Sequence, residues 1–215
     1  MSTMMSSYLV PTVVEQTARG ERLTDIYSRL LTERIVFLGT PIDDGVANVI
    51  VAQLLHLAAA EPERDIHLYV NSPGGAHTAM LAIYDTMRFV PCDVATLCVG
   101  QAADSAAILL AAGAPGKRAV LEHARVLLHQ PHTGVSRGSM SDLALEAAEL
   151  ERVRTEAEVI LARHTGRSPE QVRTDTDRAL VLHGLEAIEY GLADVVPGPQ
   201  QLLSGATSGA LHPPA

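Results

Sequence analysis

Short aliphatic and β-branched runs alternate along this chain with segments of helical periodicity, and this alternation constrains the fold most. Strands are expected at 34–39, 65–71, 93–99, 119–121 and 125–130. Helices are expected at 23–34, 42–61, from the turn at 72–75 through 89, and at 105–112. Because the links are short, the pattern predicts parallel strands joined by right-handed crossovers. The sequence therefore predicts an α/β fold.

The last third of the chain follows a different pattern. A long segment at 141–164 mixes aliphatic residues with many Glu and Arg, so we expect a helix that projects from the body. Two short helices are expected at about 169–178 and 182–190. The Gly-, Ser- and Pro-rich residues 197–215 are expected to form a disordered tail.

Charge and composition exclude several classes of function. The 25 acidic against 16 basic residues give a net charge of -9, which argues against a nucleic-acid surface. The two cysteines, Cys92 and Cys98, are interpreted as core thiols in a reducing compartment. The apolar run at 108–114 is too short to span a membrane, and residues 1–7 lack the pattern of a secretory signal. We therefore expect a cytoplasmic protein.

Two turns at the carboxyl ends of predicted strands are candidate sites. The first, at 72–75 (SPGG), offers backbone N–H groups that could stabilise an oxyanion, or it is an ordinary strand-to-helix turn. The second, at 100–105 (GQAADS), begins a helix whose dipole favours an anion. It could hold a nucleophile there, or Asp104 could simply cap the helix.

His129 ends an apolar strand and is the third candidate. A lone histidine at such a position is more often structural than catalytic. A metal site with His123 and His132 is a weak alternative, because strand faces alternate and only Glu122 lies nearby as a carboxylate. We therefore predict no metal.

Several motifs occur together and in order between about residues 9 and 196, among them LYVNSPGG, GQAA, LLHQP and EAIEYGLADVV. In these motifs the chain resembles the ClpP serine peptidases. The crotonase-type hydratases share a related fold, but the SPGG and HQP motifs favour ClpP. The resemblance implies a ClpP/crotonase-type fold, with a parallel-sheet head domain and a projecting handle helix.

The resemblance also implies a domain plan and partners. It implies a propeptide at 1–7, an axial-loop segment at 8–22 and a head domain at 23–196, with the handle helix at about 135–165. ClpP subunits form heptameric rings that stack as a tetradecamer, and a Clp-family AAA+ ATPase feeds unfolded proteins into the chamber. No cofactor is implied.

Two pairs of residues match positions that the family uses in assembly. Asp177 and Arg178 resemble the pair that makes contacts between rings. Tyr69 and Phe89 fall where the family lines its ATPase docking pocket, although His67 stands where an aromatic residue is often found.

The catalytic positions depart from the family pattern. Asp104 occupies the position of the nucleophilic serine, and Ala179 occupies that of the catalytic aspartate. Only His129 of the triad matches. The backbone N–H groups of Gly75 and Ser105 match the oxyanion hole. Since removing the carboxylate alone costs on the order of 10⁴ in rate, the loss of both partners predicts an inactive site.

Three further expectations concern these positions. Asp104 is expected to accept N–H bonds at the start of the helix and to pair with protonated His129. Ser105 is an alternative nucleophile, but on a helix it points about 100° away from its neighbour. Asp175 or Asp177 could in principle replace the missing acid, although Asp177 is assigned to the ring contact.

Two functions follow as hypotheses. The first is a regulatory, peptidase-inactive subunit that co-assembles with active ClpP paralogs. The second is an active serine endopeptidase that uses Ser105 and His129. A crotonase-like acyl-transforming enzyme is disfavoured by the motifs.

Overall fold

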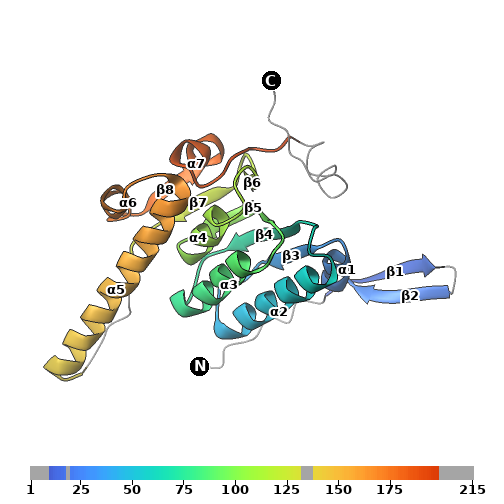
Figure 1. The fold of residues 1–215 in the computed structure, drawn as a ribbon, viewed down its shortest axis with the longest axis horizontal. Helices are drawn as coiled ribbons and strands as arrows, with labels where there is room; N and C mark the ends of the chain where they lie inside the picture. Colours follow the sequence, from blue (N-terminus) through green and yellow to red (C-terminus); the bar gives the residue numbers. More distant parts are fainter. Residues whose placement is uncertain (1–9, 18–19, 132–137, 199–215) are drawn as a thin grey trace.

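The computed structural model describes residues 10–17, 20–131 and 138–198 (Figure 1). The propeptide expected at 1–7 and nearly all of the tail expected at 197–215 lie outside the described residues, as does His132.

The head is built on one six-stranded sheet. Its strands lie in the order β3 (Ile35–Leu38), β4 (Ile66–Ser72), β5 (Val94–Ala103), β7 (Arg125–Leu128) and β8 (Leu180–His183), and β6 (Arg118–Val120) pairs with β5. The pairs among β3 to β7 are parallel, which confirms the predicted α/β class.

Strand β8 corrects the prediction, because it runs antiparallel to β7 and was not expected. We expected a helix from 182, but helix α7 (Gly184–Tyr190) begins only after β8. Only Leu182 of this four-residue strand is buried, so the segment carries too weak an alternation to identify it. Its pairing covers the edge of β7, next to the candidate site.

The N-terminal part of the chain also differs from expectation. Strands β1 (Thr12–Thr17) and β2 (Gly20–Asp25) form an antiparallel pair that begins in the expected axial-loop segment and extends three residues beyond its end at 22. Helix α1 (Ile26–Thr32) therefore begins three residues later than predicted. Asp25 sets this boundary, since its side chain accepts a hydrogen bond from the backbone N–H of Ser28.

Helices pack around the sheet as the alternation requires. Helices α2 (Asp44–Ala60) and α3 (His77–Phe89) contact each other and lie next to each other in Figure 1. Helix α4 (Ser105–Ala111) is buried along its whole length, because its residues are small or aliphatic and lie between the sheet and α5 (Met140–Thr165). Both cysteines are buried free thiols, as predicted, and burial raises the pKa of Cys98 to about 11.

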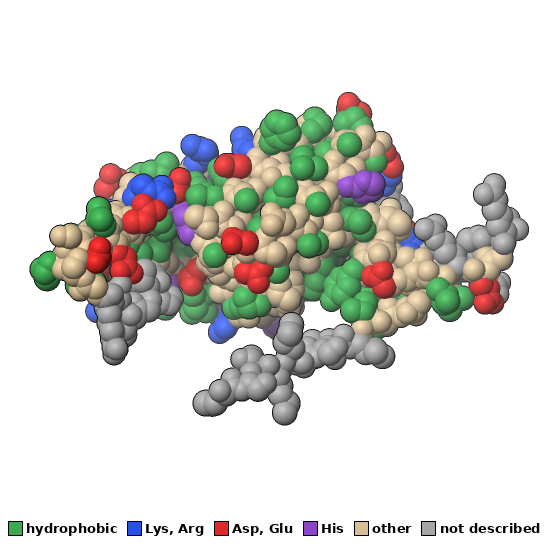
Figure 2. Space-filling model, turned by 90° about the horizontal axis from the view of Figure 1, so that it is seen from below, with side chains coloured by type: hydrophobic (Ala, Val, Ile, Leu, Met, Phe, Trp, Pro, Cys, Tyr) green, Lys and Arg blue, Asp and Glu red, His purple; other side chains and the backbone are tan. Residues whose placement is uncertain are grey.

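Helix α5 is the projecting handle helix that the sequence predicts. It begins with a capping box between Ser139 and Asp142 and ends at Gly166 in the left-handed conformation. Its buried residues all lie in the second half of the helix, and the first half extends away from the head (Figure 1). In Figure 2 the projecting end lies at the left and carries many acidic side chains. Met140 and Leu145 are exposed there.

One arginine joins the ends of three helices. Nη1 of Arg118 donates hydrogen bonds to the carbonyls of Ala111, His164 and Gly191, at or next to the ends of α4, α5 and α7. Its Nε donates to the carboxylate of Asp194 at 3.0 Å. The guanidinium thus satisfies carbonyls that helix ends leave without intrahelical partners.

Candidate active site

The candidate nucleophile lies where β5 turns into α4. We expected a turn over 100–105, but residues 100–103 belong to β5. Gln101 pairs with Arg125 and Ala103 with Leu127 of the parallel strand β7, and these ladder contacts extend the strand. The turn is therefore reduced to Asp104 alone.

Asp104 adopts a backbone conformation that L-residues rarely adopt. Its φ is 46° and its ψ is -110°, and its N–H donates to the carbonyl of Leu127 at 2.9 Å. Such a conformation costs on the order of 1–3 kcal/mol and persists only where the surroundings impose it. A sharp strand-to-helix turn of this kind presents a nucleophile at the top of an α/β sheet. We call this position the elbow.

The side chain of Asp104 does not cap the helix that follows, which corrects one expectation. It makes no capping hydrogen bond to α4. Capping residues adopt extended backbone angles, whereas the positive φ at Asp104 turns its carboxylate away from the helix N–H groups. Asp104 instead lines a pocket that His129 also lines.

The glycine turn at 72–75 packs directly against the elbow. The N–H of Ile42 donates to the carbonyl of Gly74 at 2.9 Å, and the N–H of Ala76 donates to the carbonyl of Ile42 at 2.8 Å. A Cβ on Gly75 would lie 2.1 Å from the Ile42 carbonyl oxygen, and one on Gly74 would lie 2.6 Å from the carbonyl oxygen of Ala103. Both positions therefore require glycine.

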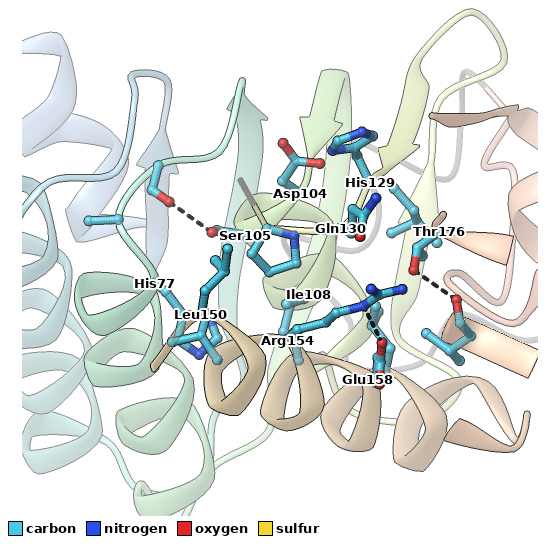
Figure 3. A pocket seen from close by; sticks show the side chains of 18 of the residues that line it. His77, Asp104, Ser105, Ile108, His129, Gln130, Leu150, Arg154, Glu158 and Thr176 are labelled. Carbon is cyan, nitrogen blue, oxygen red and sulfur yellow. Dashed lines mark hydrogen bonds and ion pairs between the residues drawn. The ribbon is translucent and has the colours of Figure 1, made fainter. Parts of the chain in front are cut away.

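Ser105 is oriented toward this turn. Its hydroxyl donates a 3.0 Å hydrogen bond to the carbonyl of Gly75, and the residue is only 8% exposed. Figure 3 shows that bond and shows Asp104 and His129 together at a different end of the pocket. The hydroxyl proton of Ser105 is thus held by a backbone carbonyl of the glycine turn.

The pocket has a volume of about 520 Å³ and lies between the elbow and the handle helix. His129, which follows β7, shares one end of it with Asp104, and α5 forms the opposite wall (Figure 3). The apolar lining includes Ile108, Leu128, Leu150, Val153, Leu161 and Val172.

The turn that would carry the catalytic acid lies beside His129. The N–H of Gln130 donates to the carbonyl of Thr176 at 3.0 Å, and its Nε2 donates to the carbonyl of Asp177 at 3.2 Å. Ala179 is exposed in the segment between α6 (Pro169–Asp175) and β8. These two bonds hold Thr176 and Asp177 against the residue that follows His129, and Ala179, two residues further along the chain, has only a methyl group.

Asp175 does not serve as a replacement acid in this structure. Its carboxylate accepts a 3.0 Å hydrogen bond from the hydroxyl of Tyr190, and Arg167 lies 3.7 Å from the same oxygen. These contacts hold Asp175 toward α7. Asp177 and Arg178 are both exposed in the turn that follows α6, so the ring contact expected of them stays a prediction.

The two residues expected to bind an ATPase lie on different elements. Tyr69 is in β4 beside Phe37, and burial raises its pKa. Phe89 is the last residue of α3 and is 79% exposed. An apolar groove of about 410 Å³ between α1, β3 and α2 has Tyr27 and Phe37 on its wall, and among the described residues Tyr69 and Phe89 do not line it.

Two contacts of the pocket wall were not predicted. Glu158 is 5% exposed and accepts hydrogen bonds from Nε of Arg154 and Nε of Arg173 at 2.9 Å. Nε2 of His77 lies 3.1 Å from Glu156. The i, i+4 spacing of Arg154 and Glu158 could have indicated the first contact. The second joins residues far apart in sequence and leaves no local signal.

Across the described ranges, no three His, Cys, Asp or Glu residues gather as metal ligands would. None of the helices described has the length and apolar character needed to cross a bilayer.

The site consists of a parallel strand, an elbow with positive φ and a helix, and a glycine turn and a histidine flank it. This is the site architecture that α/β enzymes with a serine nucleophile use. A sequence model of the family described as Clp protease matches residues 18–200. The chain belongs to this family, as its motifs predict, and its fold is the ClpP type.

Among the proteins similar to this chain are three from Rhodococcus and Streptomyces. The chain is 61% identical to ATP-dependent Clp protease proteolytic subunit 4 of Rhodococcus jostii, over 89% of this chain and 98% of that protein. It is 58% identical to proteolytic subunit 2 of Streptomyces avermitilis, over 89% and 96% of the two chains. It is also 58% identical to a putative Clp protease proteolytic subunit-like protein of Streptomyces coelicolor, over 92% and 95%.

Proposed function

We propose that this chain is a Clp protease subunit that lacks peptidase activity of its own. It contributes to ring assembly, to the chamber wall and to ATPase docking, in a cytoplasmic complex with active paralogs. In this proposal its partners are ClpP paralogs in stacked heptameric rings, a Clp-family AAA+ ATPase and unfolded protein substrates.

The observation that carries the proposal is the carboxylate at the elbow. A serine peptidase needs a hydroxyl at this position to attack the scissile carbonyl, and an oxyanion then forms next to it. Asp104 supplies no hydroxyl and places a negative charge where the oxyanion would develop. Two of the three catalytic groups are absent, since Ala179 stands at the position of the acid.

The geometry of Ser105 argues against the alternative, an active endopeptidase that uses Ser105 and His129. A nucleophile must share its proton with the general base, which requires a hydrogen bond between the two groups. The Ser105 hydroxyl instead donates to the Gly75 carbonyl. A displacement of about 1 Å already costs roughly 10²-fold in rate.

A fluorogenic peptide assay on the purified chain tests the proposal. We expect no hydrolysis above the buffer rate, and no covalent labelling of Ser105 by a fluorophosphonate. The Ser105→Ala variant is the matched control for contaminating peptidases. Hydrolysis that disappears in Ser105→Ala would establish the alternative function instead.

A repair experiment tests whether the scaffold is otherwise competent. The double variant Asp104→Ser with Ala179→Asp restores both missing groups without changing the glycine turn or His129. We expect measurable hydrolysis from this variant, and much less from either single variant, because the triad acts as a unit.

Native mass spectrometry of the chain with an active paralog tests the assembly role. We expect mixed oligomers that contain both chains. Exclusive formation of separate species would contradict co-assembly, whatever the activity of the isolated chain.

A further inference from the structure

We infer that the pocket at the elbow binds a peptide side chain that ends in an amide, as glutamine and asparagine do, with the guanidinium group of Arg154 as the donor to the amide oxygen. This inference rests on the proposed function, because the bound peptide would be a substrate or product inside the chamber of a mixed complex. It names the class of side chain that the site recognises.

Arg154 lines the cavity with donors that are not all in use. Its side chain is 20% exposed, and its Nε donates to Glu158 at 2.9 Å. The two other nitrogens, Nη1 and Nη2, donate no hydrogen bond to any residue that the structure describes. Figure 3 shows the side chain extending along the cavity, away from Leu150 and toward the end where Thr176 lies. These nitrogens can therefore donate to a ligand.

Two acceptors lie at the same end of the cavity. Gln130 and Thr176 both line it, and the N–H of Gln130 donates to the carbonyl of Thr176 at 3.0 Å. The Thr176 hydroxyl donates to the carbonyl of Val172, and Nε2 of Gln130 donates to the carbonyl of Asp177. Because backbone carbonyls engage these donors, the site offers Oγ1 of Thr176 and Oε1 of Gln130 to a ligand as acceptors. The NH₂ group of an amide is the complementary donor.

The charges around Arg154 favour an uncharged ligand over a carboxylate. Glu158 is 5% exposed and is shared by Arg154 and Arg173. Arg173 also pairs with Glu151 at 2.9 Å, so two carboxylates and two guanidinium groups balance one another. A carboxylate at the Nη groups of Arg154 would add a negative charge beside the buried Glu158. An amide oxygen accepts the same hydrogen bonds without that charge.

The other charged groups of the cavity have partners of their own. Asp104 and His129 share the elbow end (Figure 3). Glu149 pairs with Arg152 at 2.8 Å, and Glu146 is also engaged in an interaction. The preference for an amide therefore depends on the charges next to Arg154 and on no unpaired acid.

The apolar part of the cavity accommodates the methylene groups of such a side chain. Ile108 of α4 and Leu128 of β7 line it, and its volume of about 520 Å³ leaves room for the adjoining peptide backbone. Burial of the methylene groups contributes affinity. Selectivity comes from the amide, because an apolar side chain of equal length would leave the Arg154 donors without an acceptor.

The test compares three peptides that differ at one side chain. Each is fluorescein-Ala-Ala-X-Ala-Ala-amide, where X is glutamine, methionine or glutamate, three side chains of nearly equal length. We expect fluorescence anisotropy with the full chain at neutral pH to give about tenfold tighter binding of the glutamine peptide than of either other peptide, as a hydrogen bond from a charged donor provides. Equal or tighter binding of the methionine or glutamate peptide, or no binding of the glutamine peptide, would overturn the inference.

The Arg154→Met variant removes the donors and keeps an unbranched side chain. We expect the glutamine peptide to lose its advantage while the methionine peptide binds as before, because Glu158 retains Arg173. Arg88→Met is the matched control, since it removes a positive charge from an exposed position of α3 that does not line the cavity. A preference that persists in Arg154→Met, or disappears in Arg88→Met, would contradict the role of Arg154.

The Thr176→Val variant keeps the test decisive if Arg154→Met does not fold. It removes one acceptor for the amide NH₂ group and keeps the branched shape of the side chain. We expect the preference for glutamine over methionine to fall about threefold, as the loss of one uncharged hydrogen bond predicts. An unchanged preference would rule out the proposed orientation of the amide.

Chromatography of the same samples separates this inference from the proposed function. Cleavage of any of the three peptides by the chain alone would refute the proposed inactivity. Equal binding without cleavage would refute only the recognition of the amide.

Discussion

The hydroxyl of Tyr84 lies 3.0 Å from Nε2 of His164, and the two rings meet edge to face at 5.7 Å. This contact joins α3 to the last turn of the handle helix. His164 is half-buried, and burial lowers its pKa to about 4, with further contributions from Arg88, Arg118 and Arg163. The folded protein therefore favours the neutral imidazole at this position.

A pH dependence of stability follows from this shift. The pKa of His164 is lower in the folded state than in the unfolded state, where it is about 6.5. The unfolded state therefore binds the proton first, and stability falls as the pH decreases from about 6.5 to about 4. Because His164 is only half-buried, this decrease in the free energy of unfolding is on the order of 1 kcal/mol. Urea unfolding at pH 7 and pH 5 measures it.

The His164→Gln variant isolates this contribution from the other titrating groups. We expect the free energy of unfolding of the variant to fall less between pH 7 and pH 5 than that of the parent chain. An identical decrease in both proteins would show that His164 does not titrate as described.

The guanidinium of Arg118 should dominate the stability of the region where three helices end. Lysine keeps the charge but cannot reproduce the planar set of N–H donors, so Arg118→Lys leaves helix-end carbonyls without their donors. We expect the free energy of unfolding to fall by about 3 kcal/mol, which is in the range for breaking a buried ion pair. Urea denaturation checks this value.

Asp194→Asn is the matched partner variant. Burial would raise the pKa of Asp194, but the hydrogen bonds from Arg118 hold it below its ordinary value. The amide retains one acceptor for Arg118, so we expect a smaller loss than in Arg118→Lys. A larger loss would show that the carboxylate, and not the contacts to the helix ends, is the main contribution.

The backbone at the elbow is strained, and a glycine at position 104 should relieve this strain. Asp104 has a φ of 46°, which glycine adopts without a steric penalty. We expect Asp104→Gly to stabilise the fold by about 1 kcal/mol. Asp104→Ala keeps a Cβ and should give no such gain. An equal gain in both variants, measured by thermal unfolding, would assign the effect to the removed carboxylate.

Glu158 should hold α6 to the handle helix. Its side chain is buried between Arg154 and Arg173. Glu158→Gln removes the carboxylate that these two guanidinium groups share and leaves Arg173 with Glu151 as its remaining partner. We expect a loss of about 2 kcal/mol and faster amide hydrogen exchange in α6. Glu149→Gln is the control, since that carboxylate pairs with Arg152 in solvent and its removal should be near neutral. Equal effects of the two variants would contradict the role of burial.

The sequence was sufficient for the parts of the fold that carry strong periodicity. The parallel strands, helices α2 to α4 and the projecting helix α5 were predicted because each has an aliphatic pattern of adequate length. Strand β8 and the β1–β2 pair were missed, since both depend on pairing with a partner strand. The motifs also located Asp104, His129 and the glycine turn at one site.

Side-chain orientation was beyond the reach of the sequence. The expected capping role of Asp104 failed because its backbone angle depends on β5 continuing along β7. The hydrogen bond from Ser105 to Gly75 depends on the approach of two turns far apart in sequence. Such contacts arise from tertiary packing, which local propensity does not encode.

The carboxylate at the elbow has a practical consequence for counting active centres. Reagents that form a covalent bond with a serine hydroxyl at this position find no hydroxyl at residue 104. In a mixed ring, titration with such a reagent would report the number of active neighbours and not the total number of subunits. The ratio of titrated sites to protein mass would then give the subunit composition directly.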